Sequence, residues 1–446
     1  MRHKNRLLFL IPLSLTALAA AGCGGWIRSP PPVASTAPTA STAPADAVPT
    51  DSELTEDTIR FLEERVRSDT KDFIAYNKLS GYYLRAAQET GDMKYLELAA
   101  RTSDASLKAI PAEANPGGLA ASAQVKYMSH DFAGARDSAL RLRELEPNKS
   151  LAHQLLAEAL IELGNYEEAE AALSQMQRIG GVNFATETRL ARVDLLRGRV
   201  DAARKRYANA LALALNVVPP SRETVAWCRW QLGEIAFGRG DYEEAEQRYR
   251  ESLATYTDYY RALAALGRVR AARGDMAGAI EQYEKVVKRL PDPAFVAALG
   301  DLYKLAGRER EAEAQYALVE QIARLGALQG ALYNRQLALF YADHDLKAAE
   351  AYRLAAKEYE VRRDIYGADA LAWAALKAGK TDEARAAIKD ALRLGTEDAR
   401  LFYHAGMIAR AAGDAEGARK FLERALALNP QFDPLQARVA REALTK

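Results

Sequence analysis

The sequence is poor in the side chains that most often carry chemistry. Only two of its 446 residues are cysteines, Cys23 and Cys228, and two cysteines cannot build a disulfide framework or a cysteine-based zinc site. Histidine is also scarce, and its five copies are scattered: His3, His130, His153, His344 and His404. The sequence has no Walker loop and no G-x-G-x-x-G, H-E-x-x-H or C-x-x-C motif. We therefore expect a non-enzymatic protein without catalytic residues, metal or cofactor.

Neither sign of charge is in excess. The 61 basic and 60 acidic residues leave a net charge of +1 at pH 7, which excludes a generic polybasic surface for nucleic acid or membrane lipid. We therefore expect no nucleic-acid partner. Asp343, His344 and Asp345 stand together, as they would in a metal or proton-relay site. They fall at a turn between two predicted helices, where polar side chains are usual, so we assign them no such role.

The N-terminus has the pattern of a secretory signal. The segment "MRHKNR" is basic, and an apolar run from Leu7 ends in small residues before Cys23, as is typical of signal peptides. The ending "AAGC" resembles a bacterial lipobox, although Ala20 stands where leucine is more typical. The resemblance implies that residues 1–22 are removed and that Cys23 is acylated. The alternatives are an unlipidated signal or an uncleaved anchor.

The resemblance to lipoproteins also carries an expectation about location. The residue after the cysteine is Gly24 and not an aspartate. In lipoproteins of two-membrane bacteria this favours the outer membrane, with the protein facing the periplasm. Residues 23–52 are then rich in Pro, Ala, Ser and Thr, and such a segment cannot bury a core. We predict a flexible linker that spans up to roughly 80 Å between the lipid and the next domain.

We predict that residues 53–446 form one domain, because their sequence repeats itself. Apolar residues recur at three- and four-residue steps before and after Gly240, which predicts a helix, a tight turn and a second helix. Glycines in the same relation to their flanks recur 34 residues apart, from Gly164 to Gly198 and from Gly240 to Gly274. His130 and His344 mark two turns without glycine. A glycine ends the first helix in the left-handed conformation, and an aspartate such as Asp241 caps the next.

These repeats resemble the tetratricopeptide repeat family. The stretch "QLGEIAFGRGDYEEAEQRYRESL" matches the family pattern at Leu232, Gly233, Gly240, Tyr242, Ala245 and Tyr249. We count about ten units between residues 72 and 430, with a capping helix at 433–446. The resemblance implies an all-α fold, an α-solenoid that forms a right-handed superhelix with a concave groove, in which each hairpin touches only its neighbours.

The family's groove positions, projected onto this sequence, give the candidate partner-binding residues. They are Trp227, Trp230, Glu234, Phe237, Arg261, Arg268, Asp301, Lys304, Arg335, Trp373, Tyr403 and Arg410. Trp227, Trp230 and Phe237 follow one helix face, either as an aromatic ledge in the groove or as a contact between repeats. The set is aromatic and mostly basic, which suits an acidic peptide or a glycan with carboxylates.

Two functions fit these features. In the first, the protein is a lipid-anchored scaffold of the bacterial cell envelope that binds a peptide or protein partner in its groove. In the second, it is an accessory or regulatory subunit of an envelope polysaccharide or export system and contacts a glycan polymer. Family resemblance implies protein binding without chemistry, but fold alone does not fix function. Self-association of the array stays open.

Overall fold

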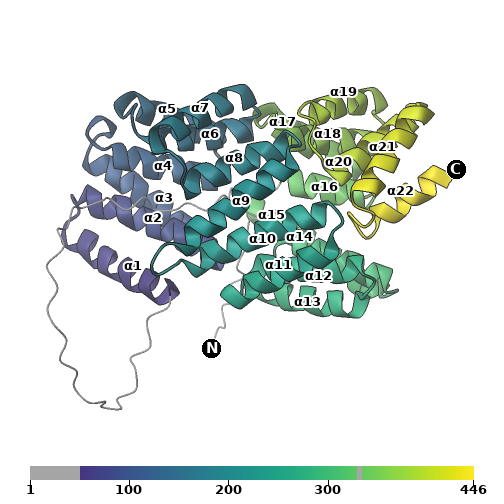
Figure 1. The fold of residues 1–446 in the computed structure, drawn as a ribbon, viewed down its shortest axis with the longest axis horizontal. Coiled ribbons are helices and arrows are strands. Elements are labelled where there is room, and N and C mark those ends of the chain that lie inside the picture. The colour runs from purple at the N-terminus through teal and green to yellow at the C-terminus, as the bar shows by residue number, and fades with distance from the viewer. Residues whose placement is uncertain (1–50, 329–333, 446) are drawn as a thin grey trace, which may run out of the picture.

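The computed structural model describes residues 51–328 and 334–445, and every regular element in these ranges is a helix (Figure 1). The described helices include α1 (Asp51–Ser68), ten consecutive pairs, one 3₁₀ turn (Ala112–Ala114) and α22 (Gln436–Thr445). The predicted α-solenoid of about ten hairpins is confirmed. The pairs are α2 (Phe73–Thr90) with α3 (Met93–Ala109), α4 (Pro116–Met128) with α5 (Phe132–Leu145), α6 (Ser150–Leu163) with α7 (Tyr166–Gly180), α8 (Phe184–Leu196) with α9 (Val200–Leu215), α10 (Arg222–Gly238) with α11 (Tyr242–Thr255), α12 (Tyr260–Ala272) with α13 (Met276–Arg289), α14 (Pro293–Leu305) with α15 (Glu309–Leu328), α16 (Asn334–Asp343) with α17 (Ala348–Val361), α18 (Ile365–Lys377) with α19 (Thr381–Leu392), and α20 (Ala399–Ala411) with α21 (Ala415–Leu428).

The turn inside each pair follows from its sequence. Gly240 has φ +75°, a conformation that glycine adopts without the cost other residues meet. Asp241 then accepts a hydrogen bond from the Glu244 amide and caps α11. Where glycine is missing, His130 itself takes φ +62°. At the other such turn Asp345, rather than His344, takes the left-handed conformation with φ +55°.

Small residues let the two helices of a pair approach closely. A Cβ atom on Gly233 would lie 2.4 Å from a ring carbon of Tyr249, and one on Gly267 would lie 2.8 Å from Tyr283. Ala245 is fully buried in the same contact. The glycine of the first helix and the aromatic residue of the second therefore pack as knob and hole, which explains why the two positions repeat together in the sequence.

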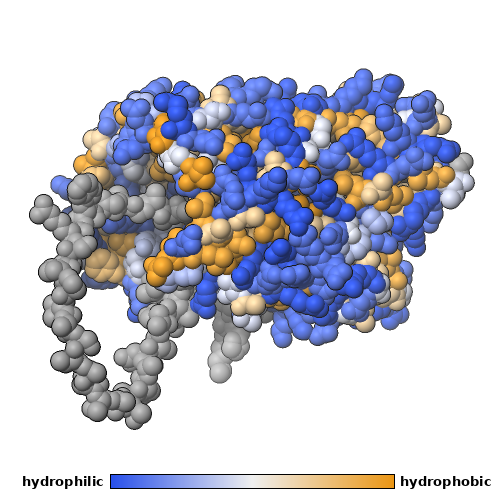
Figure 2. Space-filling model, viewed as in Figure 1, coloured by the Kyte–Doolittle hydropathy of each residue, from blue (hydrophilic) through white to orange (hydrophobic). Residues whose placement is uncertain are grey.

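The insertion after α9 breaks the register of the repeat and leaves apolar side chains at the surface. Leu215, Val217 and Val218 lie at this connection, and Val218 is 92% exposed. On the face drawn in Figure 2, hydrophilic residues cover most of the surface, and hydrophobic ones gather over its middle. At the other end, Asp433 accepts from the amides of Leu435 and Gln436 and so caps α22.

The solenoid winds far enough for distant repeats to meet. In Figure 1, α17 and α18 lie beside α7 and α8. Arg362, in the connection before α18, forms an ion pair with Glu162 at the end of α6. The Ile365 amide donates to the Tyr166 hydroxyl at 2.9 Å, and Ile365 packs in one apolar cluster with Tyr166.

Two further contacts continue this line. Thr396 Oγ1 donates to the Leu196 carbonyl, and Asn429 Nδ2 donates to the Phe237 carbonyl at 2.7 Å. We call the line of contacts Glu162–Arg362, Tyr166–Ile365, Leu196–Thr396 and Phe237–Asn429 the seam. Its partners are 192 to 200 residues apart. The expectation that each hairpin touches only its neighbours is therefore wrong.

The predicted signal peptide, Cys23 and most of the linker lie outside the described residues. Within residues 51–328 and 334–445, no helix combines the length and the apolar character needed to cross a membrane.

Candidate functional site

Two adjoining cavities lie along the first helices of the later pairs. The smaller has a volume of about 170 Å³ and the larger about 560 Å³. Both are lined by α10, α12 and α14, and the larger extends to α16, α20 and the connection between α21 and α22. They share Glu234, Arg268, Tyr283 and Ala294, so they form one continuous concave surface.

The smaller cavity is built around an arginine held between aromatic rings. The Arg261 guanidinium carbon lies 5.4 Å from the centre of the Trp230 ring and 5.1 Å from that of Tyr260, which are favourable cation–π distances. Asp292 lines the same cavity and caps α14 through the Ala294 amide. Burial raises the pKa of Asp292 to about 7. This cavity therefore offers flat rings and a positive charge.

The larger cavity holds a histidine with an acceptor facing each of its ring nitrogens. His344 Nδ1 lies 2.6 Å from the Phe340 carbonyl oxygen, and Nε2 lies 2.7 Å from Asp301 Oδ1. While Asp301 is ionised both partners are acceptors, and an imidazolium ion, which donates from both ring nitrogens, satisfies them. Burial at the same time raises the pKa of Asp301. Burial opposes the charge, but the hydrogen bond and negative charge of Asp301 outweigh it and raise the pKa of His344. The Tyr316 hydroxyl also donates to Asp301, at 2.7 Å.

Acidic side chains dominate the rest of this cavity. Asp343 accepts from Trp373 Nε1 at 2.8 Å and from Gln436 Nε2. Arg400 donates to Asp433 at 2.8 Å and lies 3.9 Å from Asp343. Two elements far apart in the chain, α16 and the start of α22, thus meet at one carboxylate.

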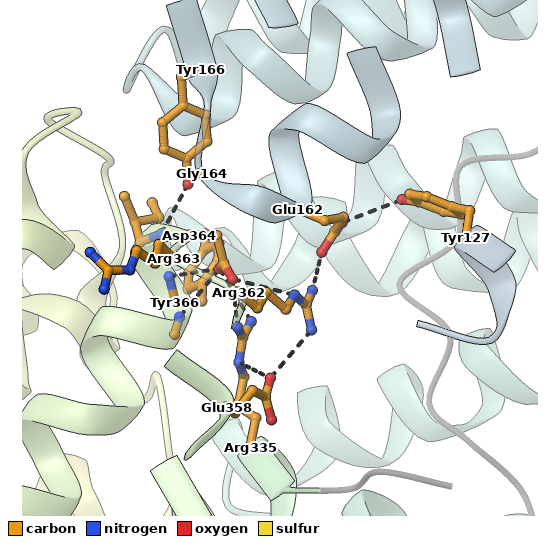
Figure 3. Close-up of polar contacts among 12 residues, drawn as sticks. Tyr127, Glu162, Gly164, Tyr166, Arg335, Glu358, Arg362, Arg363, Asp364 and Tyr366 are labelled. Carbon is orange, nitrogen blue, oxygen red and sulfur yellow. Dashed lines mark hydrogen bonds and ion pairs between the residues drawn. The ribbon is translucent and has the colours of Figure 1, made fainter. Parts of the chain in front are cut away.

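The seam carries a second polar cluster, shown in Figure 3. Glu162 is 2% exposed at its side chain, forms ion pairs with Arg192 and Arg362, and accepts from the Tyr127 hydroxyl at 3.3 Å. Although burial alone would raise the pKa of Glu162, the two arginines hold it well below its usual range. The Arg362 guanidinium also lies 4.6 Å from the centre of the Phe132 ring. These ion pairs join α6 and α8 to the connection before α18, so the cluster stabilises the contact between distant repeats.

Comparison with known proteins identifies the repeat. Tetratricopeptide-repeat family models match residues 127–181, 183–258, 236–302 and 370–431. The chain carries tetratricopeptide repeats. It is also 25% identical over 318 residues to the TPR repeat-containing protein YpiA of Bacillus subtilis, which covers 70% of this chain and 64% of that protein.

Two further similarities are more distant. Cellulose synthase operon protein C of Xanthomonas axonopodis pv. citri is 28% identical over 218 residues, which cover 47% of this chain and 14% of that protein. The chain thus spans less than two thirds of the length of either curated relative. A human IFIT1 dimer with PPP-AAAA is similar at 14% identity and a TM-score of 0.44, over 86% of this chain and 96% of that one.

The two cavities are lined by half of the predicted groove residues. Those that line one or both cavities are Trp230, Glu234, Phe237, Arg261, Arg268 and Asp301. They lie on α10, α12 and α14, where the family's groove positions place them. That these residues bind a partner stays a prediction.

Three of the predicted aromatic residues lie in the core. Trp227 is 1% exposed and contacts Phe184 and Tyr207, and Trp373 is 1% exposed and stacks on His404. Tyr403 is buried beside Trp373. Of the two alternatives for this helix face, Trp227 fits the contact between repeats, because its ring is buried against Tyr207. Trp230 is the tryptophan that lines the smaller cavity.

The basic members of the predicted groove are also placed differently. Lys304 and Arg410 are exposed and do not line either cavity. Arg335 is bound in ion pairs with Asp364 and Glu358 near the seam (Figure 3). The lining of the larger cavity is mainly acidic rather than basic, and its arginines are paired with carboxylates. The class of ligand stays a prediction.

Four acidic residues of the larger cavity, Asp343, Glu397, Asp398 and Asp433, are not among the predicted groove residues. Asp398 and Asp433 stand directly before helices and cap them. Because an aspartate is common at this position, nothing in the sequence marks either residue as part of a cavity. Asp343 and His344 were assigned to a polar turn, and the ring of His344 instead reaches Asp301 on another repeat. Within the described ranges no group of three or more metal-binding side chains is arranged to hold a metal ion.

Proposed function

We propose that this protein is a non-enzymatic scaffold that binds a segment of a partner protein along the two cavities. The continuous surface from Trp230 to Asp433 supports this function, because it combines half-buried rings, charged groups and a hollow of about 560 Å³. Such concave surfaces with a few convergent polar groups are the usual places where ligands bind. Tetratricopeptide-repeat proteins in general bind protein partners through their concave face.

We further propose that the scaffold works at the bacterial cell envelope, held by an acyl chain on Cys23 on the periplasmic side of the outer membrane. The basic start, the apolar run and the ending "AAGC" support this. Metabolic labelling with a fatty acid tests it. The wild-type protein should be labelled, and the Cys23→Ser variant should not. A wild-type protein without label would remove the anchor.

Recovery of the partner from envelope extracts tests the scaffold. Trp230→Ala and Arg261→Ala each remove one side of the platform in the smaller cavity, and we expect recovery to fall at least tenfold, because buried aromatic and arginine anchors carry much of the energy of an interface. Lys304→Ala is the matched control, since Lys304 is exposed on a first helix outside both cavities. Equal recovery with all three variants would exclude the cavities as the binding site.

The alternative is an accessory subunit of an envelope polysaccharide or export system that contacts a glycan. The similarity to cellulose synthase operon protein C favours it. Aromatic rings such as Trp230 and Tyr260 present flat apolar faces that would also suit sugar rings. The same recovery experiment separates the two functions. A polysaccharide retained by the wild-type chain without any protein, and lost with Trp230→Ala, would replace the first proposal by the second.

A further inference from the structure

We propose that the larger cavity binds an organic cation, an amine or guanidinium carried on an aliphatic stem. This inference deepens the proposed function and rests on it, since it names the chemistry of the segment that the concave surface takes. It concerns the end of the surface between Asp301 and Gln436, away from the platform of Trp230 and Arg261.

The charges that line this cavity are mostly negative. Its carboxylates are Glu234, Asp301, Asp343, Glu397, Asp398 and Asp433, and its cationic groups are Arg268, Arg400 and His344. Arg268 is bound to Glu234, and His344 to Asp301. The guanidinium of Arg400 contacts two carboxylates. Glu397 is paired with Arg424, which does not line the cavity. Among the described residues, Asp398 and one of the two carboxylates at Arg400 are left without a cation of their own, and a cation that entered the cavity would gain from them.

Two carboxylates of the cavity use only one oxygen in their internal hydrogen bonds. Asp301 accepts both of its hydrogen bonds, from Tyr316 and His344, on Oδ1. Asp398 accepts from the amides of Arg400 and Leu401 on Oδ1 as well. Among the described residues no hydrogen bond reaches Oδ2 of either aspartate, so this oxygen can accept from a donor outside the chain. An ammonium group has three N–H donors and a guanidinium has five, so either could bridge such oxygens.

Gln436 supplies an observation that is independent of charge. Its side chain lines the cavity and is only 5% exposed. Because Nε2 donates to the Asp343 carboxylate, the orientation of the amide is fixed, and the carbonyl oxygen Oε1 is the atom left over. Oε1 is buried and has no hydrogen-bond partner among the described residues. Buried acceptors without donors are costly and rare, so this oxygen calls for an N–H from a ligand.

Apolar side chains line the same cavity and would cover the stem of such a cation. They are Leu302, Val319, Leu339, Phe340 and Phe432. A lysine or arginine side chain has this composition, with an aliphatic chain that packs on apolar surface and a charged head, and so does a polyamine. A volume of about 560 Å³ lies within the range of pockets that hold small ligands.

Calorimetric titration of the full chain in detergent tests the inference. The probes are spermidine and a tri-lysine peptide, each compared with its acetylated, uncharged analogue. Asp343→Asn and Asp398→Asn remove one charge each and keep an oxygen acceptor, and we expect each to weaken binding about tenfold, as the loss of one charge-assisted hydrogen bond does. Asp414→Asn is the matched control, because Asp414 caps α21 in the same way as Asp398 caps α20 but does not line the cavity.

The outcomes distinguish a free polyamine from a basic segment of the partner, and they distinguish failure of the cation site from failure of the scaffold function. Tighter binding of spermidine identifies a free polyamine, and tighter binding of tri-lysine identifies a basic segment of the partner. Binding of the acetylated analogues as tight as that of the cations, or equal binding by Asp343→Asn, Asp398→Asn and Asp414→Asn, would overturn the inference. In that case the scaffold function still stands if Trp230→Ala and Arg261→Ala lose the partner.

Discussion

Replacing Glu162 by glutamine should open the seam without unfolding the repeats on either side of it. The carboxylate is 2% exposed at its side chain and is paired with Arg192 and Arg362. The substitution keeps the size of the side chain and removes its charge, so it leaves two guanidinium groups partly buried without their partner. Loss of one member of a buried ion pair costs about 3–5 kcal/mol.

The structure places the cost at the lower end of that range. Arg192 is 22% exposed, so water reaches it, and Arg362 keeps weaker contacts with Glu358 and Asp364 at 3.6 and 3.3 Å. We therefore expect a loss of about 3 kcal/mol from the free energy that closes the seam. The folded pKa of Glu162 is depressed, so its contribution is complete above the unfolded value of about 4.3 and is lost only as the pH falls through the folded value.

Amide hydrogen exchange measures this directly. The Ile365 amide donates to Tyr166 across the seam, so a loss of about 3 kcal/mol should speed its exchange by roughly a hundredfold. Amides in α12 and α13, away from the seam, serve as the internal control. The variant should also show a larger radius of gyration in solution scattering. Unchanged exchange at Ile365 and an unchanged radius would refute the view that this ion pair closes the solenoid.

The remaining predictions concern local features. Burial and the charge of Arg362 lower the pKa of His130 from 6.5 to about 4, so the contribution of His130 to the free energy of unfolding is complete above pH 6.5 and falls as the pH drops towards 4. His130→Asn should flatten this decline in the unfolding midpoint, since asparagine tolerates the φ of +62° at this position. An unchanged pH dependence would contradict the prediction. Gly233→Ala should cost about 1–3 kcal/mol, because its Cβ would lie 2.4 Å from the Tyr249 ring, whereas the control Gly238→Ala meets no atom within 4 Å and should stabilise slightly in denaturant titration. Asp241→Ala should cost about 1 kcal/mol through the lost cap of α11 and Asp241→Asn almost nothing, and equal midpoints for the two would argue against capping.

Much of the fold could be predicted because it is written in short-range patterns. The left-handed φ of Gly240, the cap at Asp241 and the contact of Gly233 with Tyr249 all lie within one repeat. The seam could not be predicted in this way. Its partners are about 200 residues apart, and neither Glu162 nor Arg362 repeats with the period, so no local pattern marks them as a pair.

The candidate site was predictable only in part, for a related reason. Family positions on α10, α12 and α14 led to Trp230, Arg261 and Asp301, because those helices keep the regular register. A helical face alone does not show whether Trp227 or Trp230 points into the cavity, since a first helix packs on two sides. Asp433 and Gln436 belong to the end of the array, which follows no repeat.

The seam also decides how the larger cavity comes into being. Asn429 lines that cavity and forms hydrogen bonds with the Phe237 carbonyl and the Tyr242 hydroxyl. Part of the cavity wall is therefore kept in place by contacts across the seam. A solenoid whose repeats contact only their neighbours can unfold from its ends one repeat at a time. In this protein, opening of the seam would displace that part of the cavity wall in a single step. By thermodynamic linkage, a ligand that binds more tightly when the seam is closed stabilises the closed seam by the same free energy by which closure strengthens binding. The protein would then be stiff while loaded and able to release by uncoiling.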